Sequence, residues 1–362
     1  MSSEFDPVIA RTTGRFAKQR PLGTAVVGYG YWGPNLARNV NERPELELRA
    51  LCDPSDSAAA SFRSRYPGVP VCADLEDVLL DDDIDAVVVA TPPQTHHAIV
   101  RRALLAGKHV LVEKPLATTG ADALDLVELA EERGLVLMPG HTFVYSPSVN
   151  TVRDLIIEDV VGEVFFITSS RMNLGKYQRD GVICDLAPHD LSILLYWLEQ
   201  PVVQVSASAR SVFQSGVPET AFITLTFEGG TTANVQISWL APRKVRQMVV
   251  VGSRRMIQYD DTASDEPIRI YDRGMDFSSP ANFGEYQLTY RSGDVVIPRI
   301  DAVEPLSLEL EDFARSIRTG ESPRSSAQLG LEIVQVIEAA ETSLRRHGMP
   351  IALARPGLRT AA

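Results

Sequence analysis

The sequence has 362 residues, of which 44% are apolar and 23% charged, a balance typical of a globular protein with enough core for two domains. Its formal net charge of −12 argues against nucleic acid or a membrane surface as a partner. Three cysteines without metal-ligand spacing predict no metal site and a reducing, cytoplasmic setting. Residues 1–20 lack the apolar core of a signal peptide, so we expect a mobile N-terminal tail.

The first predicted strand leads into a glycine-rich turn. Three glycines follow it in the spacing G-x-G-x-x-G, and a helix begins near Pro34. In that setting the glycines permit a tight turn, a close approach to a pyrophosphate and tight helix–strand packing, and the helix N-terminus favours phosphate. The cofactor-binding residues predicted here are Gly28, Gly30, Tyr31, Trp32 and Gly33.

A single carboxylate strengthens that prediction. Asp53 ends the second apolar strand, about 20 residues after the last glycine, where a carboxylate accepts hydrogen bonds from an adenosine ribose. The alternative is a turn residue before Pro54. Because a carboxylate at this place repels a 2′-phosphate, the two features together favour NAD as the cofactor over its phosphorylated form.

Strands and helices alternate up to about residue 140. The run 84–90 is apolar except for Asp85, as expected for a central parallel strand buried on both faces. A helix over 121–133, closed by Gly134, precedes a strand over 135–138. This order predicts a doubly wound α/β domain over residues 21–145, an NAD-binding Rossmann domain.

The second half reads as an α+β domain over 146–350 with a large, mostly antiparallel sheet. Short alternating segments are separated by turn signals, and Gly229-Gly230 joins two of them as a hairpin. We expect an irregular loop over 171–184, a polar excursion over 260–292, two closing helices and a C-terminal tail over 351–362.

Two loops at the carboxyl edge of the first sheet carry candidate site residues. Thr91-Pro92-Pro93 and His96 follow the central strand, and Glu113-Lys114-Pro115 ends the next. Ligands of open α/β sheets bind at this edge. A lysine there could hydrogen-bond a substrate hydroxyl, with a solvated strand-end lysine as the alternative. Pro115 is a candidate for a cis peptide bond.

Asp185 and His189 stand four residues apart at the predicted start of a helix over 186–198. That spacing places both side chains on one helix face. A carboxylate beside an imidazole stabilises the imidazolium, the pairing that an acid/base needs. The alternative is a capping aspartate with a structural histidine; the neighbouring Asp190 is expected to be structural.

Two further segments supply polar groups. The expected loop before Asp185 carries Arg171, Asn173, Lys176, Tyr177 and Arg179, which could grip a diphosphate or carboxylate or remain solvated. The segment 140–145, with His141 and Tyr145, crosses between the two domains, where small-molecule sites tend to form.

Together these motifs resemble the family of glucose–fructose oxidoreductase, inositol dehydrogenase and MocA. The likeness covers about residues 21–350, and its motifs are the glycine turn, Asp53, Thr91-Pro92-Pro93 with His96, Glu113-Lys114-Pro115 and Asp185-x-x-x-His189. The resemblance implies NAD(P)-dependent chemistry at a sugar or cyclitol hydroxyl, with Lys114, Asp185 and His189 as the catalytic set.

Within that family, residues 30–36 and 171–190 look most like the nucleotide-sugar 3-dehydrogenases, which act on UDP-N-acetylglucosamine-type sugars or their uronates. Cys184 stands where this branch is expected to have tryptophan, beside the sugar. The residues expected to bind substrate are Lys114, His141, Tyr145, Arg171, Asn173, Asp185 and His189; those expected to bind cofactor also include Asp53, Thr91, Pro92, His96, Glu113 and Lys114.

The sequence therefore predicts an NAD-dependent oxidoreductase, most simply one that acts at C3 of a nucleotide-linked hexose. An inositol or free-sugar dehydrogenase, a sugar ketoreductase and a non-catalytic NAD-sensing protein remain as alternatives. His189 or Lys114 would take the hydroxyl proton, and Asp185 would orient them and raise the pKa of His189. Apolar residues on the second sheet predict a homodimer or homotetramer.

Overall fold

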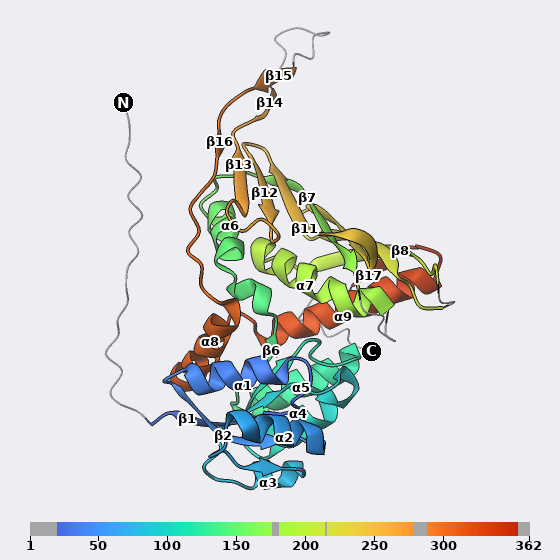
Figure 1. Ribbon diagram of the computed structural model, residues 1–362. Helices are drawn as coiled ribbons and strands as arrows, with labels where there is room; N and C mark the ends of the chain where they lie inside the picture. The colour runs from blue at the N-terminus through green and yellow to red at the C-terminus, as the bar shows by residue number, and fades with distance from the viewer. Residues whose placement is uncertain (1–19, 176–180, 214–215, 278–287, 354–362) are drawn as a thin grey trace.

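The computed structural model describes residues 20–175, 181–213, 216–277 and 288–353. Within these ranges the chain forms two bodies, each built on one large sheet, with helices between and around the sheets (Figure 1). The arrangement confirms the expected fold class, a Rossmann sheet followed by an α+β body.

The first sheet has six parallel strands in the order β3-β2-β1-β4-β5-β6. Val26 and Val27 of β1 pair with β2 on one side and with β4 on the other. The doubly wound order places the carboxyl ends of β1, β4 and β5 along one edge. The strand bounds are β1 Leu22–Val27, β2 Leu46–Cys52, β3 Val71–Cys72, β4 Ala86–Val89, β5 His109–Glu113 and β6 Leu137–Gly140.

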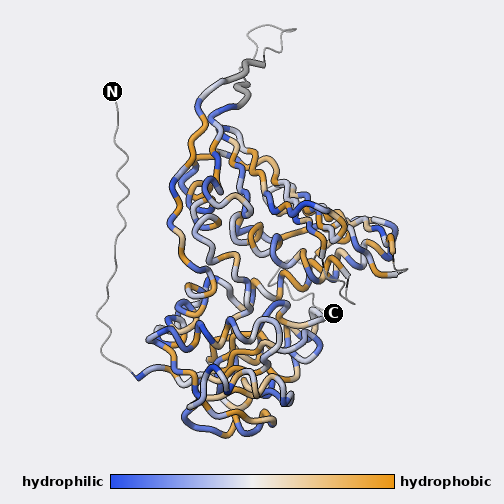
Figure 2. The backbone as a smooth tube through the Cα atoms, viewed as in Figure 1, coloured by the Kyte–Doolittle hydropathy of each residue, from blue (hydrophilic) through white to orange (hydrophobic). Residues whose placement is uncertain are grey.

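Helices cover both faces of this sheet, so alternate strand residues enter two separate cores. Figure 2 shows hydrophobic residues gathered in the interior of this body. Ser55, Asp74 and Thr119 cap three of the helices with their side chains. The helix bounds are α1 Gly33–Glu42, α2 Asp56–Arg65, α3 Leu75–Leu79, η1 Pro93–Thr95, α4 His96–Leu105 and α5 Gly120–Arg133.

The second sheet has nine strands in the order β16-β13-β12-β11-β7-β10-β9-β8-β17. Its pairs are antiparallel except β7 with β10. The hairpin predicted at Gly229-Gly230 joins β9 to β10. The bounds are β7 Val164–Leu174, β8 Val202–Arg210, β9 Thr220–Phe227, β10 Thr232–Ser238, β11 Leu240–Gly252, β12 Met256–Asp260, β13 Ile268–Tyr271, β16 Val295–Val296 and β17 Ile351–Ala352.

Helices α7 and α9 pack against one face of this sheet and bury its inward residues, among them Val205, Val235 and Ile237. No helix within the described ranges is long and apolar enough to cross a membrane. The bounds are η2 Thr142–Tyr145, α6 Pro147–Ile157, α7 Gly181–Leu198, α8 Pro305–Thr319 and α9 Ala327–Arg345.

The end of the chain returns to the first body. Leu310 and Phe313 of α8 share a core with Val26 and Met138 of the first sheet, and α8 lies beside α1 (Figure 1). Leu331 of α9 enters the core on the other face of that sheet. The division at residue 145 stays a prediction, but the contacts show that the two bodies share their last helices.

Four local expectations were wrong. The loop expected over 171–184 is shorter, because β7 continues to Leu174 and α7 begins at Gly181. Asp185, expected at the start of a helix over 186–198, therefore lies inside α7 rather than at its N-cap. The excursion expected over 260–292 contains β13 and a separate pair, β14 (Gly274–Phe277) with β15 (Leu288–Arg291). Ile351–Ala352, expected in the C-terminal tail, pair with β8.

The return of α8 generates a test of stability. Phe313 is 0% exposed, so Phe313→Ala should lower the free energy of unfolding by about 3–5 kcal/mol through lost burial and a cavity. Phe213, 83% exposed, offers the matched control, and Phe213→Ala should leave the urea unfolding midpoint unchanged. Equal midpoints for both variants would contradict the packing described for α8.

Candidate active site

The glycine turn after β1 has the shape of a diphosphate cradle. Gly28 has φ +93°, and a Cβ there would lie 2.8 Å from the carbonyl oxygen of Ala90. A Cβ on Gly33 would lie 2.5 Å from the carbonyl oxygen of Gly28. A Cβ on Gly30 would meet no atom within 4 Å, so this backbone faces open space next to the start of α1. The residues fit the pyrophosphate of a dinucleotide.

Asp53 is held at the end of β2 by two backbone donors. The N–H of Tyr29 donates to its Oδ2 over 2.7 Å and the N–H of Ser55 to its Oδ1 over 2.8 Å. Both oxygens keep a lone pair for another donor. Tyr31 and Trp32, 88% and 42% exposed, form the outer side of the same turn. The carboxylate is thus oriented beside the cradle, where a ribose hydroxyl would lie.

The loop after β4 is tied to the turn after β5 by His96. This histidine is fully buried, and its Nδ1 and Nε2 lie 2.7 and 2.9 Å from the carbonyl oxygens of Pro115 and Thr91. Thr91 also accepts a hydrogen bond from Thr95, and Pro92 lies exposed at the loop surface. His96, expected to bind cofactor, is therefore occupied in joining these two loops rather than facing solvent.

Lys114 connects the two bodies. Its Nζ donates to the backbone oxygen of Asp185 over 2.9 Å and lies 3.5 Å from the Oδ1 of the same residue. The peptide bond that follows, Lys114–Pro115, is cis. The lysine side chain thus runs from the carboxyl edge of the first sheet to helix α7 of the second body.

The other oxygen of Asp185 has its own donor. The indole Nε1 of Trp239 donates to Oδ2 over 3.0 Å, and Trp239 is buried at the junction of β10 and β11. Asp185 therefore holds an ammonium on one oxygen and an indole on the other. Both contacts fix the direction in which Lys114 presents its remaining protons.

His189 follows one turn later on α7, with its ring edge against Phe143 at 5.2 Å between centroids. Burial lowers the pKa of His189 well below the usual value, and the nearby positive charges of Lys114 and Arg171 lower it further. The expectation that Asp185 raises this pKa was wrong. The carboxylate of Asp185 contacts Lys114 instead, and the charged groups around His189 are cations. The imidazole of His189 is therefore neutral at neutral pH.

A second neutral histidine lies close by. His141, at the end of β6, is 2% exposed, and burial together with Lys114 lowers its pKa to about 3. Neither ring nitrogen has a hydrogen-bond partner among the described residues. A buried imidazole without partners loses the hydrogen bonds that it makes with water. The two unpartnered nitrogens of His141 therefore indicate that a polar group of a ligand binds next to this ring.

A pair of carboxyl groups lies beneath these residues. Burial raises the pKa of Glu113 to about 7, against the opposing effect of Lys114. Glu309 of α8 is buried, accepts a hydrogen bond from Thr142 over 2.8 Å, and has its pKa raised well above the usual value by burial and by Glu113. The end of β5 thus carries Lys114 beside Glu113, a carboxyl group that titrates near neutral pH, and α8 brings Glu309, whose pKa is higher than usual, close to Glu113.

Arg171 departs from its expected role. It is 3% exposed, and its Nε and Nη2 donate to Oδ1 of Asp190 over 3.0 and 2.9 Å. Its guanidinium also lies 4.5 Å from the Phe143 ring centroid. Asp190 is structural, as expected, because it pairs with Arg171. Arg171 in turn packs against the Phe143 ring, which contacts His189. Asn173 is half-buried two residues further along β7, while Lys176, Tyr177 and Arg179 lie outside the described residues.

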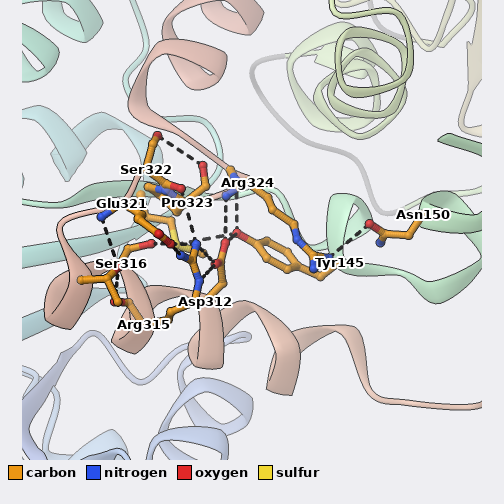
Figure 3. Close-up of polar contacts among 12 residues, drawn as sticks. Tyr145, Asn150, Asp312, Arg315, Ser316, Glu321, Ser322, Pro323 and Arg324 are labelled. Atoms are coloured by element: carbon orange, nitrogen blue, oxygen red, sulfur yellow. Dashed lines mark hydrogen bonds and ion pairs between the residues drawn. The ribbon is translucent and has the colours of Figure 1, made fainter. Parts of the chain in front are cut away.

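Tyr145 is buried away from this cluster, contrary to expectation. Figure 3 shows its hydroxyl directed at Asp312 of α8, to which it donates over 2.9 Å, while it accepts from the N–H of Ser325 over 3.1 Å. Arg315 donates to the other oxygen of Asp312. Tyr145 thus fastens α8 to the segment between the bodies and has no open side for a substrate.

Cys184 also points elsewhere. Its Sγ lies 3.3 Å from Oε1 of Glu341 on α9, about 100° around the helix from Asp185. The expectation that it borders the sugar therefore has no support in the contacts of α7.

Several residues that build the site carry no functional signal in the sequence. Trp239, Arg246 and Glu309 come from elements far along the chain, and Phe143 was noted only as part of a polar crossing segment. A tryptophan ending an alternating strand and a glutamate on an amphipathic helix carry no local signal of function. Only the packing of the second body against the first brings them to Lys114 and His189.

Two family models match the chain. The model described as "Oxidoreductase family, NAD-binding Rossmann fold" matches residues 22–141, and the "GFO/IDH/MocA C-terminal domain" matches residues 149–258. Among relatives, a dTDP-3,4-didehydro-2,6-dideoxy-alpha-D-glucose 3-reductase of Saccharopolyspora spinosa is 30% identical over 311 residues, covering 80% of this chain and 86% of the relative. An inositol 2-dehydrogenase of Corynebacterium glutamicum is 26% identical, covering 60% and 67%.

Solved structures share the fold. A UDP-N-acetylglucosamine 3-dehydrogenase of Acidithiobacillus ferrooxidans superposes with a TM-score of 0.75 at 24% identity, covering 90% of this chain and 98% of its own. A protein of gentamicin A biosynthesis in complex with NAD superposes with a TM-score of 0.78 at 23% identity, covering 94% and 98%.

The placement of Asp53 generates a test of cofactor choice. NADH should bind at least about tenfold more tightly than NADPH, roughly 1.4 kcal/mol, because the carboxylate repels a 2′-phosphate. Asp53→Ala should narrow this ratio in a fluorescence titration, and Asp56→Ala, which removes an exposed charge nearby on α2, should not. Equal affinities of the wild-type protein for the two cofactors would contradict the role given to Asp53.

Proposed function

The chain belongs to the GFO/IDH/MocA family of oxidoreductases, and from that premise we propose that it transfers hydride between C3 of a nucleotide-linked hexose and NAD. It is an NAD-binding oxidoreductase that acts on a CH–OH group of a sugar. The choice of a nucleotide-linked substrate and of C3 draws on the named relatives, a dTDP-sugar 3-reductase and a UDP-sugar 3-dehydrogenase.

The observation that carries the proposal is the contact between Lys114 and Asp185. It brings a strand end of the dinucleotide-binding body within 2.9 Å of the helix that bears His189. His141 faces the same place with two unpartnered nitrogens. A hydroxyl-bearing carbon held there would meet a proton donor, a proton acceptor and the cofactor side of the site together.

The electrostatics favour different roles for the two basic residues. Lys114, whose Nζ lies 3.5 Å from the Oδ1 of Asp185, donates a hydrogen bond to the reacting oxygen and stabilises the negative charge that develops there. His189, neutral because of burial and nearby cations, accepts the hydroxyl proton. NAD, when bound, supplies the nicotinamide carbon that takes or returns the hydride.

Three alternatives bear on substrate, direction and residue roles. An inositol or free-sugar dehydrogenase would use the same residues, and one named relative is an inositol 2-dehydrogenase. A ketoreductase would run the reaction backwards, as the name of the dTDP-sugar relative describes. In the third alternative, Lys114 rather than His189 accepts the hydroxyl proton.

The substrate is tested by assaying NADH formation with a panel of UDP- and dTDP-hexoses, free hexoses and inositols. Turnover only with the free compounds would overturn the proposal.

Replacing the two residues tests their roles. His189→Ala should lower turnover by about 10²–10⁴-fold, the usual contribution of a positioned acid/base, and leave NADH binding intact. Lys114→Met should cost a comparable factor. His97→Ala, on the surface of α4, is the control. Near-normal turnover of His189→Ala together with inactive Lys114→Met would make the lysine the base.

The pH dependence follows from the lowered pKa of His189. A base must be unprotonated, so the oxidation rate should be lost only on the acid side of the ordinary histidine range, where His189 takes up a proton. The rate attributable to this group should stay level through neutral pH. A limb that rises above the ordinary histidine pKa and vanishes in His189→Ala would contradict the neutral state assigned here.

We also propose that the open face of the second sheet joins copies of the chain. Phe166 and Phe222 lie on this face, each 42% exposed, opposite the face covered by α7 and α9. Light scattering should give a dimer or tetramer of the 39.7 kDa chain. The double variant Phe166→Glu with Phe222→Glu should be a monomer, while Leu80→Glu, on the first body, should keep the oligomer. A monomeric wild-type protein would refute the proposed interface.

We also propose a cytoplasmic location, which is consistent with the three free cysteines.

A further inference from the structure

Strand β11 makes an excursion beside the site. In its pairing with β7, Leu240 lies opposite Leu174, and the next paired residue, Val245, lies opposite Met172. Residues 241–244 of β11 therefore stand against the single residue Asn173. Insertions of this kind bend a strand and redirect its side chains, and they are common next to active sites.

Both ends of the excursion are fixed in the site. Trp239, just before β11, donates to Asp185 over 3.0 Å. Arg246, just after the excursion, pairs with Asp261 over 2.8 Å and lies 5.9 Å from the Phe143 ring. Its charge also contributes to lowering the pKa of His189. The short segment between them therefore lies at the border of the cluster around Lys114 and His189.

The excursion carries two cations that the site does not neutralise. Lys114, Arg171 and Arg246 each have a carboxylate partner. Arg243 and Lys244 are exposed, and neither forms an ion pair with another residue in the described part of the chain. In a chain of net charge −12, this is a local surplus of positive charge on the second body, next to the site.

We propose that residues 241–244 form the subsite for the diphosphate of the nucleotide-linked substrate, held by the side chains of Arg243 and Lys244. This inference rests on the proposed function and names the group that the cluster around Lys114 leaves unbound. A guanidinium binds phosphate oxygens in pairs, and an ammonium adds a compact charge. The sugar would lie inward toward Lys114 and His189, and the nucleoside outward.

A second diphosphate, that of NAD, could compete for the same cations. The cradle formed by Gly28, Gly30 and Gly33 lies on the other body, after β1, and provides for it. The two sources are therefore separable by experiment. Loss of substrate affinity alone assigns the cations to the substrate, and loss of NADH affinity assigns them to the cofactor.

The test compares two double variants of equal charge. Arg243→Gln with Lys244→Gln removes the cations of the excursion, and Arg133→Gln with Arg346→Gln removes two exposed cations elsewhere. Calorimetric titration of UDP and of dTDP into protein saturated with NADH measures the subsite without turnover. The first variant should bind the preferred nucleotide about 10- to 100-fold more weakly, the loss expected for two charge-assisted contacts; the control and the affinity for NADH should stay within twofold.

Unchanged nucleotide affinity in the first variant would overturn the inference, as would an equal loss in both variants or a loss of NADH affinity. Turnover separates it from the proposed function. If the wild-type protein oxidises nucleotide-linked hexoses and the first variant keeps their KM, the subsite alone is wrong. If the wild-type protein oxidises only free sugars and binds neither nucleotide, both are wrong.

Discussion

The contact of Lys114 with Asp185 is the interaction on which the site depends. One residue ends a parallel strand of the dinucleotide-binding sheet, and the other lies inside a helix of the second body; the ammonium reaches both the backbone and the carboxylate of its partner. Trp239 holds the second carboxylate oxygen, and His96 ties the turn after Lys114 to the loop after the neighbouring strand. Removing any of these supports would free the lysine to point elsewhere.

The groups around this contact lower the pKa values of the two nearby histidines. The three cations beside His189 have carboxylate partners, while the two imidazoles are buried and held neutral. Burial raises the pKa of Glu113 to about 7 and that of Glu309 well above its usual value, and the charge of Glu113 raises the pKa of Glu309 further. A neutral imidazole beside the Lys114 side chain suits the proposed removal of a hydroxyl proton as hydride leaves the same carbon.

The sequence predicted what local chemistry determines and missed what long-range packing determines. The glycine turn and Asp53 follow from strand–turn–helix geometry, and the antiparallel sheet follows from alternation and turns. The start of α7 was misplaced because Asp185 has the local pattern of a capping residue. Tyr145 and Arg171 were predicted to bind substrate, but they are buried against Asp312 and Asp190, respectively. The local sequence around a polar residue does not show whether its side chain faces a ligand or a buried partner from another part of the chain.

Hydride transfer from C3 is tested most directly by tracing the hydrogen atom on that carbon. A UDP- or dTDP-hexose carrying deuterium at C3 is incubated with the protein and NAD, and the nicotinamide product is analysed by mass spectrometry. If hydride leaves C3 in this site, the deuterium appears in the reduced cofactor and Lys114→Met abolishes the transfer. Reduced cofactor formed without deuterium, with the label retained in the sugar, would contradict reaction at C3 in the site that Lys114 and Asp185 assemble.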